Sequence, residues 1–167
     1  MKINQKKHKL HTCNSTREEK CNLIKKCLFY VLFLFCSVSA FSQVNNIVGR
    51  WKTIDDKTGE VKSIVLIYKD QNGKYYGKIE KLFKYSDAKC EKCKDENKNK
   101  PILGMVIITD MKEKGDKLEG GLILDPENGE KYYVTISYEK ESGKLKLRGS
   151  IDKFGVIGRN QFWEKAE

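Results

Sequence analysis

The chain lacks histidine beyond its first segment. Both histidines of the 167-residue sequence, His8 and His11, lie within the first 42 residues. If those residues are removed as a leader, the mature protein contains no imidazole. This excludes histidine-based catalytic triads, histidine general bases and histidine metal ligands.

The chain also lacks a clustered basic patch, although its formal net charge is +10. Residues 1–42 hold eight Lys or Arg and two Asp or Glu, so they carry +6 of this excess. Residues 43–167 hold the other 25 basic and 21 acidic residues, which leaves +4. These charges are interspersed as on an ordinary solvated surface, and we expect no nucleic-acid partner.

The first 42 residues have the three parts of a secretory signal peptide. Lys25 and Lys26 precede an apolar run at 27–36, and small residues follow up to Ala40 and Ser42. The apolar run is short for a membrane span, which favours export over anchoring. Cleavage after Ser42 would start the mature chain at position 43, and cleavage after Ala40 is the alternative.

Two features qualify this leader. A start codon assigned too far upstream would account for residues 1–22, since the positive segment is unusually long. Cys36 raises the question of lipidation, but Phe35 stands where a lipoprotein signal needs a small residue. We therefore expect a leader over 1–42, a single domain over 43–167, and a location in the periplasm or outside the cell. The oligomeric state is left open.

Residues 117–139 show the pattern that the rest of the chain repeats. Leu118, Gly120, Leu122 and Leu124 alternate with Glu119, Gly121, Ile123 and Asp125, and a second alternating run follows at 132–139. Alternation with β-branched and aromatic residues predicts strands, and the intervening Asn-Gly tolerates the positive φ of a hairpin turn. The pattern predicts strands at 47–54, 61–69, 74–83, 104–110, 117–124, 132–139, 144–151 and 156–165.

These segments predict an all-β protein, since no long helical period appears after the leader. Short sequential strands joined by tight turns favour an up-and-down antiparallel meander. Eight strands can close into a barrel that is either filled or holds one small ligand, and closure removes exposed sheet edges. A β-sandwich is the alternative.

A long polar loop at 84–101 interrupts the pattern and holds Cys90 and Cys93, the two cysteines that remain after the leader. A structural disulfide that stiffens the loop is the favoured interpretation, because exported proteins retain disulfides. A redox pair would need a helix N-terminus in a βαβ context, which is missing. A zinc site normally needs four Cys or His ligands, so metal binding would require nearby carboxylates or a second chain. Free thiols without a role are the last alternative.

Acidic residues cluster at Asp55, Asp56 and 125–130, which are all predicted turns. Asp in turns accepts hydrogen bonds from backbone N–H groups, and this reading is preferred. Paired acids for glycoside chemistry would face each other across a cleft, and the spacing does not indicate one. We expect no catalytic residue, cofactor or metal.

Aromatic residues on the predicted strands are candidates to line a ligand cavity. Tyrosine combines an apolar body with a polar tip, which suits ligand pockets. The alternative is that these residues fill the core, and a one-residue register slip would change which of them face inward. The candidates are Tyr68, Tyr75, Tyr132, Tyr138 and Trp163.

The two ends of the predicted barrel resemble the lipocalin and wider calycin pattern. Gly49 and Trp51 form a G-x-W motif on the first strand, and Arg159 lies on the last strand. In that family the G-x-W packs under an arginine of the last strand, with the guanidinium stacked on the indole. The resemblance implies that Gly49, Trp51 and Arg159 close the base of the barrel.

Longer motifs resemble an exported bacterial family catalogued as domain of unknown function 2147. They are, in order, G-R-W-K-T-I-D-D-K-T-G, C-E-K-C, K-P-I-L-G-M, E-G-G-L-I-L-D-P-E-N-G-E-K-Y, L-K-L-R-G and G-R-N-Q-F-W. The resemblance covers residues 47–164 and implies a calycin-like barrel outside the cytoplasm. It brings no established activity and no agreed catalytic residues.

Three functions follow as hypotheses. The leading one is non-catalytic binding of a small, partly apolar ligand in the barrel interior or mouth. The second is a structural or interaction module of the cell envelope, with a filled barrel that contacts a protein partner through the loop at 84–101 or an outer patch. The third is thiol redox or metal chemistry at the C-x-x-C loop.

Overall fold

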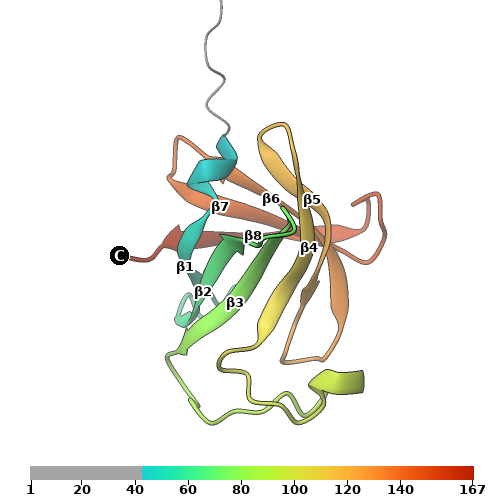
Figure 1. Cartoon of the computed structure of the whole chain (residues 1–167). Coiled ribbons are helices and arrows are strands. Elements are labelled where there is room, and N and C mark those ends of the chain that lie inside the picture. The colour runs from blue at the N-terminus through green and yellow to red at the C-terminus, as the bar shows by residue number, and fades with distance from the viewer. Residues whose placement is uncertain (1–42) are drawn as a thin grey trace, which may run out of the picture. The chain divides into compact units, whose positions relative to one another are not determined.

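A computed structural model describes residues 43–167 (Figure 1). The predicted leader and its cysteines and histidines lie outside the described residues. The strands are β1 (Gly49–Ile54), β2 (Val61–Lys69), β3 (Tyr75–Leu82), β4 (Val106–Lys114), β5 (Lys117–Leu124), β6 (Lys131–Glu139), β7 (Lys144–Ser150) and β8 (Gly158–Lys165). Two short 3-10 helices are η1 (Gln43–Asn46) and η2 (Asp95–Asn97). Neither helix in this part of the chain is long and apolar enough to cross a membrane.

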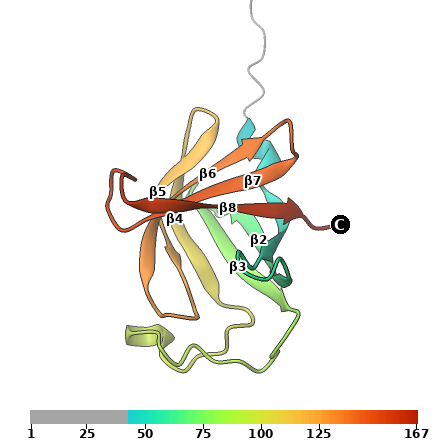
Figure 2. The same cartoon turned by 180° about the vertical axis from the view of Figure 1, so that it is seen from behind.

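The eight strands form a closed barrel in which each strand pairs antiparallel with the next (Figures 1 and 2). The barrel closes where β1 meets β8: Trp51 pairs with Lys165, and Lys52 with Glu164. The prediction of an all-β, eight-stranded, up-and-down barrel is confirmed, and the sandwich alternative is excluded. Pairing all around the ring leaves no edge strand open to another sheet.

The two ends of the barrel differ. The end that we call the closed end carries η1 and the hairpin turns β2–β3, β4–β5 and β6–β7. There η1 contacts β5 and β6, and Val44 and Ile47 are buried. The other end, which we call the mouth, carries the connections β1–β2, β3–β4, β5–β6 and β7–β8.

Apolar side chains fill the barrel from the closed end to its middle. They come from every second position of the strands, as the alternating sequence pattern predicts. The buried side chains of this interior include Trp51, Val65, Ile67, Ile108, Met111, Leu118, Ile136, Leu145 and Trp163. Such a packed interior is the main source of stability for a domain of this size.

Strand β4 extends beyond its predicted end at Asp110, where a bulge bends the strand without ending it. Tyr75 and Gly77 of β3 pair with Met111 and Ile108, so β4 has one extra residue between these partners. Asp110 there adopts a φ of 59°. A bulge bends a strand without ending it, so β4 continues to Lys114 instead of stopping at Asp110.

Strand β5 has a matching bulge that reverses which side chains face inward. Leu118 pairs with Ile136 and Gly121 pairs with Val134, so β5 also has one extra residue, and Gly120 has a φ of +80°. Beyond the bulge Gly121 faces the interior, whereas Leu122 faces outward. The unbroken alternation in the sequence therefore hides a change of face within β5.

Candidate functional site

Trp51 anchors the closed end of the barrel. Its indole Nε1 donates a 2.8 Å hydrogen bond to the carbonyl of Ile47, and the ammonium of Lys165 lies 4.5 Å from the centre of its ring. A Cβ on Gly49 would lie 2.9 Å from this ammonium, so glycine provides the space for it. Trp51 and Gly49 thus lie together beside the Lys165 side chain at this end of the barrel.

Arg159 does not take the place expected for it. Lys165 is the cation over Trp51 because these two residues pair across the β1–β8 seam. Arg159 lies at the start of β8, at the mouth, where its Nη1 is 3.4 Å from Asp56 Oδ2. Its side chain is 70% exposed. The arginine therefore belongs to the polar rim of the mouth.

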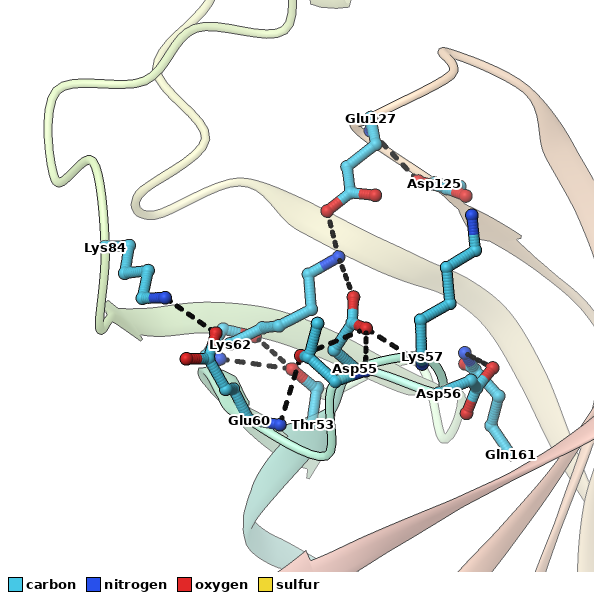
Figure 3. A network of polar contacts seen from close by, with 12 residues as sticks. Thr53, Asp55, Asp56, Lys57, Glu60, Lys62, Lys84, Asp125, Glu127 and Gln161 are labelled. Atoms are coloured by element: carbon cyan, nitrogen blue, oxygen red, sulfur yellow. Dashed lines mark hydrogen bonds and ion pairs between the residues drawn. The ribbon is translucent and has the colours of Figure 1, made fainter.

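A chain of polar contacts at the mouth links the β1–β2 turn to the β5–β6 turn and to β8 (Figure 3). Lys62 Nζ forms an ion pair with Glu127 of the β5–β6 turn and lies 3.6 Å from Asp55 Oδ2. Figure 3 shows the lysine reaching between these two carboxylates. Asp56 accepts a 2.9 Å hydrogen bond from Gln161 of β8. Lys62, Asp55, Asp56 and Glu127 are thus engaged with one another or with β8.

The acids of the turns have structural partners. Asp55 Oδ1 accepts hydrogen bonds of 2.9 Å from the N–H groups of Lys57 and Thr58. The bond from Thr58 is the largest cause that lowers the pKa of the Asp55 carboxyl, followed by the bond from Lys57. Asp125 Oδ1 accepts the N–H of Glu127 in the same way. This agrees with their assignment as turn-capping groups.

Of the five aromatic residues predicted to line a cavity, four lie on the inward face of the sheet and Tyr68 lies on the outer face. Trp163 and Tyr75 are buried in the filled interior, and the ring of Tyr138 lies 6.3 Å from that of Trp51. Tyr75 donates a 2.9 Å hydrogen bond to Glu113, and its pKa is raised, chiefly by burial. On the outer face, Tyr68 stacks on Tyr76 with ring centres 6.0 Å apart.

Tyr132 stands apart from the other four. It is half-buried at the mouth end of β6, and its hydroxyl accepts a 3.0 Å hydrogen bond from Asn128 Nδ2. It is therefore the one predicted aromatic residue that lies beside the mouth.

The two cysteines form a disulfide that is buried within the β3–β4 connection. Their Cα atoms are 5.3 Å apart, and the loop bonds back on itself through Cys90 N–H to Lys100 O at 2.9 Å and Asn99 N–H to Cys90 O at 3.0 Å. The predicted disulfide is thus present. Within residues 43–167, no group of three or more His, Cys, Asp or Glu side chains is placed to hold a metal ion.

The cysteine loop, residues 84–104, packs against the β5–β6 turn. The Cys90 sulfur lies 3.2 Å from the carbonyl oxygen of Pro126, and Lys94 forms a 2.8 Å ion pair with Glu130. Gly129 has a φ of +76°, and a Cβ there would overlap the backbone of Lys92. This close approach fixes the loop relative to the barrel wall.

A groove of about 460 Å³ lies between this loop and the outer face of β4 and β5. It is outside the barrel, because Leu122 and Leu124 alternate with Ile123, which pairs with the interior residue Ile108. The β5 bulge thus supplies its apolar wall. The lining residues are Glu96, Asn97, Lys100, Pro101, Leu103, Gly104, Met105, Val106, Ile107, Thr109, Leu122, Leu124 and Lys131.

The groove combines an apolar floor with a net positive rim. Leu124 and Ile107 are buried beneath it, while the rim carries Lys100, Lys131 and Glu96. Both lysines are exposed, and neither forms an ion pair within residues 43–167. An apolar floor with two available ammonium groups can hold a molecule that has an apolar body and an anionic head.

The sequence offered only a weak signal for this groove. The segment 101–106 is more apolar than the rest of the cysteine loop, which indicates contact with another surface. Lys100 and Lys131 are distant along the chain, and only folding brings them to the same groove. The outward direction of Leu122 depends on the bulge, which alternation alone does not reveal.

Fold and closure together define the class: a small, eight-stranded barrel of the lipocalin-like type. A similar solved structure is protein HP1028 of Helicobacter pylori, described as belonging to the lipocalin family. It has a TM-score of 0.63 and 24% identity over 72% of this chain and 82% of that one, which shows the fold alone. The chain belongs to the family described as "Uncharacterized protein conserved in bacteria (DUF2147)", whose pattern matches residues 49–165. Curated proteins gave no match.

Proposed function

We propose that this protein binds a small, partly apolar anion without catalysis, in the groove between the cysteine loop and the outer face of β4 and β5. The observation that carries this proposal is the apolar floor beside two lysines that have no ion-pair partner in the described chain. The volume of the groove, about 460 Å³, is in the range of small-molecule pockets, roughly 300–1,000 Å³.

The groove suits this ligand better than the barrel interior does. Apolar side chains fill the interior from the closed end to the middle. At the mouth, Lys62 and Arg159 are engaged by carboxylates, so a ligand there would have to displace these contacts. In the groove, an anionic head meets lysines whose ammonium groups are available, and its apolar body covers Leu122 and Val106.

Thiol redox catalysis has little support. Such an enzyme needs an accessible thiol that is partly ionised near neutral pH. Cys90 and Cys93 are bonded to each other, and both are buried. We therefore assign the pair to holding the loop that forms one wall of the groove.

We further propose that the protein is exported and acts in the periplasm or outside the cell. The support is the predicted signal peptide over 1–42 together with the disulfide, which an oxidising compartment preserves. An interaction role in the cell envelope is the second candidate function. It is favoured by the exposed apolar loop between β7 and β8.

Native mass spectrometry of the processed protein, purified from its own host, tests the binding proposal. We expect a non-covalent adduct that is lost on denaturation, with the mass of a small amphipathic anion. The same spectrum reports the oxidation state of Cys90 and Cys93. A ligand-free mass, combined with no binding of added decanoate, would contradict the proposal.

A further inference from the structure

The loop between β7 and β8 exposes four large apolar side chains within residues 151–157, which we call the apolar loop. The exposed fractions are 64% for Ile151, 90% for Phe154, 75% for Val156 and 62% for Ile157. The loop projects sideways beyond the strands, on the right in Figure 1 and on the left in Figure 2. A concentration of exposed apolar groups usually marks an interaction surface.

The apolar loop is held in shape by one carboxylate. Asp152 Oδ1 accepts the N–H groups of Phe154 at 2.9 Å and Val156 at 3.1 Å, and Oδ2 accepts that of Ile157 at 2.7 Å. The N–H of Gly155 bonds to the Asp152 carbonyl at 3.2 Å. Four consecutive backbone donors are therefore satisfied within the loop, and the apolar side chains point away from this centre.

A second contact holds the loop against the barrel. Arg148 of β7 donates to the carbonyl of Gly155 through Nε at 2.8 Å and Nη2 at 2.6 Å, and to that of Val156 at 3.2 Å. The N–H of Ile151 also bonds to the carbonyl of Ile157 at 3.1 Å, which closes the loop at its base. The loop thus presents its apolar tip without first having to become ordered.

We propose that the apolar loop docks this protein onto an anionic lipid surface, with Phe154, Val156 and Ile157 entering the membrane interface. Backbone groups that are already hydrogen-bonded enter a water-poor interface at low cost, because they lose no water partners there. The tip is convex, so a lipid surface accepts it without a preformed pocket.

The charge around the apolar loop is complementary to anionic lipid headgroups. Lys153 is exposed beside Phe154 and forms no ion pair within residues 43–167, whereas Arg159, where β8 begins, is paired with Asp56. Both oxygens of Asp152, the acid of this segment, are already engaged by backbone N–H groups. Cations next to exposed apolar side chains are the combination by which peripheral proteins bind anionic leaflets.

Co-sedimentation with vesicles tests this docking. The barrel closes and buries its core within residues 43–167, so the chain is tested in that form, without the apolar leader. We expect binding to vesicles of phosphatidylglycerol and phosphatidylcholine that exceeds binding to phosphatidylcholine alone. Phe154→Ser/Ile157→Ser should weaken binding by about tenfold or more, because the anchoring apolar area is lost.

Tyr85→Ser is the matched control, since Tyr85 is 80% exposed in a different loop and should not affect docking. Lys153→Glu should weaken binding to the anionic vesicles and leave the weak binding to phosphatidylcholine unchanged. No binding by the unsubstituted chain, or equal loss with Tyr85→Ser, would overturn the proposal. Self-association that Phe154→Ser/Ile157→Ser abolishes, without vesicle binding, would identify a second copy as the occupant and also overturn it.

Discussion

The ammonium of Lys165 lies 4.5 Å from the centre of the Trp51 ring and closes one end of the barrel. The first and last strands meet there, so this contact joins the two ends of the β-sheet. Gly49 is part of the same arrangement, because a side chain at that position would collide with the lysine. The closure uses a cation over an indole, but the cation is lysine at the end of β8.

The substitution Lys165→Met should lower the free energy of unfolding by about 1 kcal/mol, because the indole of a buried tryptophan loses its cation. Arg159→Met should cost less than about 1 kcal/mol, because Arg159 is largely exposed and its pair with Asp56 is screened by solvent. Urea unfolding followed by tryptophan fluorescence measures both. A larger loss of stability for Arg159→Met than for Lys165→Met would show that the arginine, and not the lysine, stabilises the closure of the barrel.

Two glycines in similar turns give a test of the loop packing. Gly73 and Gly129 both follow asparagine and have φ values of +79° and +76°. Gly73 has open space around it, whereas Gly129 faces the backbone of Lys92. We expect Gly73→Ala to cost about 1 kcal/mol from backbone strain alone. Gly129→Ala should cost clearly more, because the cysteine loop must also move.

Thermal unfolding of both variants gives these costs, and amide exchange shows where Gly129→Ala acts. The expected change is faster exchange in the cysteine loop, with the barrel strands protected as before. Equal costs for Gly73→Ala and Gly129→Ala would show that the contact with Lys92 contributes nothing.

The fold was predictable from local signals. Asn128-Gly129 forms the expected turn, and its glycine has the positive φ that this turn requires. Alternation located the strands, because each strand of a barrel has one buried face. The pair Cys90 and Cys93 was readable because only two cysteines remain after the leader.

The candidate site was not predictable to the same extent. The G-x-W motif was recognised, but pairing of Trp51 with Lys165 depends on the register of the seam, which spacing does not reveal. Arg159 is also a cation on β8, but it lies at the start of the strand, at the mouth, whereas Trp51 packs against the end of the strand. The groove depends on two bulges, near Asp110 in β4 and at Gly120 in β5. Each bulge shifts by one residue which side chains of its strand face the barrel interior.

Removal of the disulfide should affect the loop more than the barrel. The ring closed by Cys90 and Cys93 is short, so Cys90→Ala/Cys93→Ala should lower the free energy of unfolding by no more than about 2 kcal/mol. Exchange of the Asn99 and Ile102 amides, which bond within the loop, should become faster. Hydrogen exchange measures both regions, and a parallel increase in β2 and β6 would contradict a local role.

The apolar loop should loosen in acid. Backbone hydrogen bonds, chiefly that from Ile157, hold the pKa of Asp152 below its usual value of 3.8. The carboxylate therefore stabilises the loop at and above pH 3.8, and this contribution is lost as the pH falls through the lower pKa of the folded state. NMR titration of the Phe154, Val156 and Ile157 amides should show this transition. A transition at 3.8, without changes in these amides, would contradict the anchoring role.

Titration of decanoate into matched charge variants by calorimetry tests the binding account most directly. Lys100→Glu/Lys131→Glu places two negative charges at the groove, while Lys117→Glu/Lys140→Glu makes the same change at the closed end. We predict that the groove variant binds decanoate at least about tenfold more weakly than the unsubstituted protein, since two interactions with the carboxylate are lost. The closed-end variant should bind as the unsubstituted protein does. Equal affinities for the two variants, or no binding by the unsubstituted protein, would contradict a ligand site in the groove.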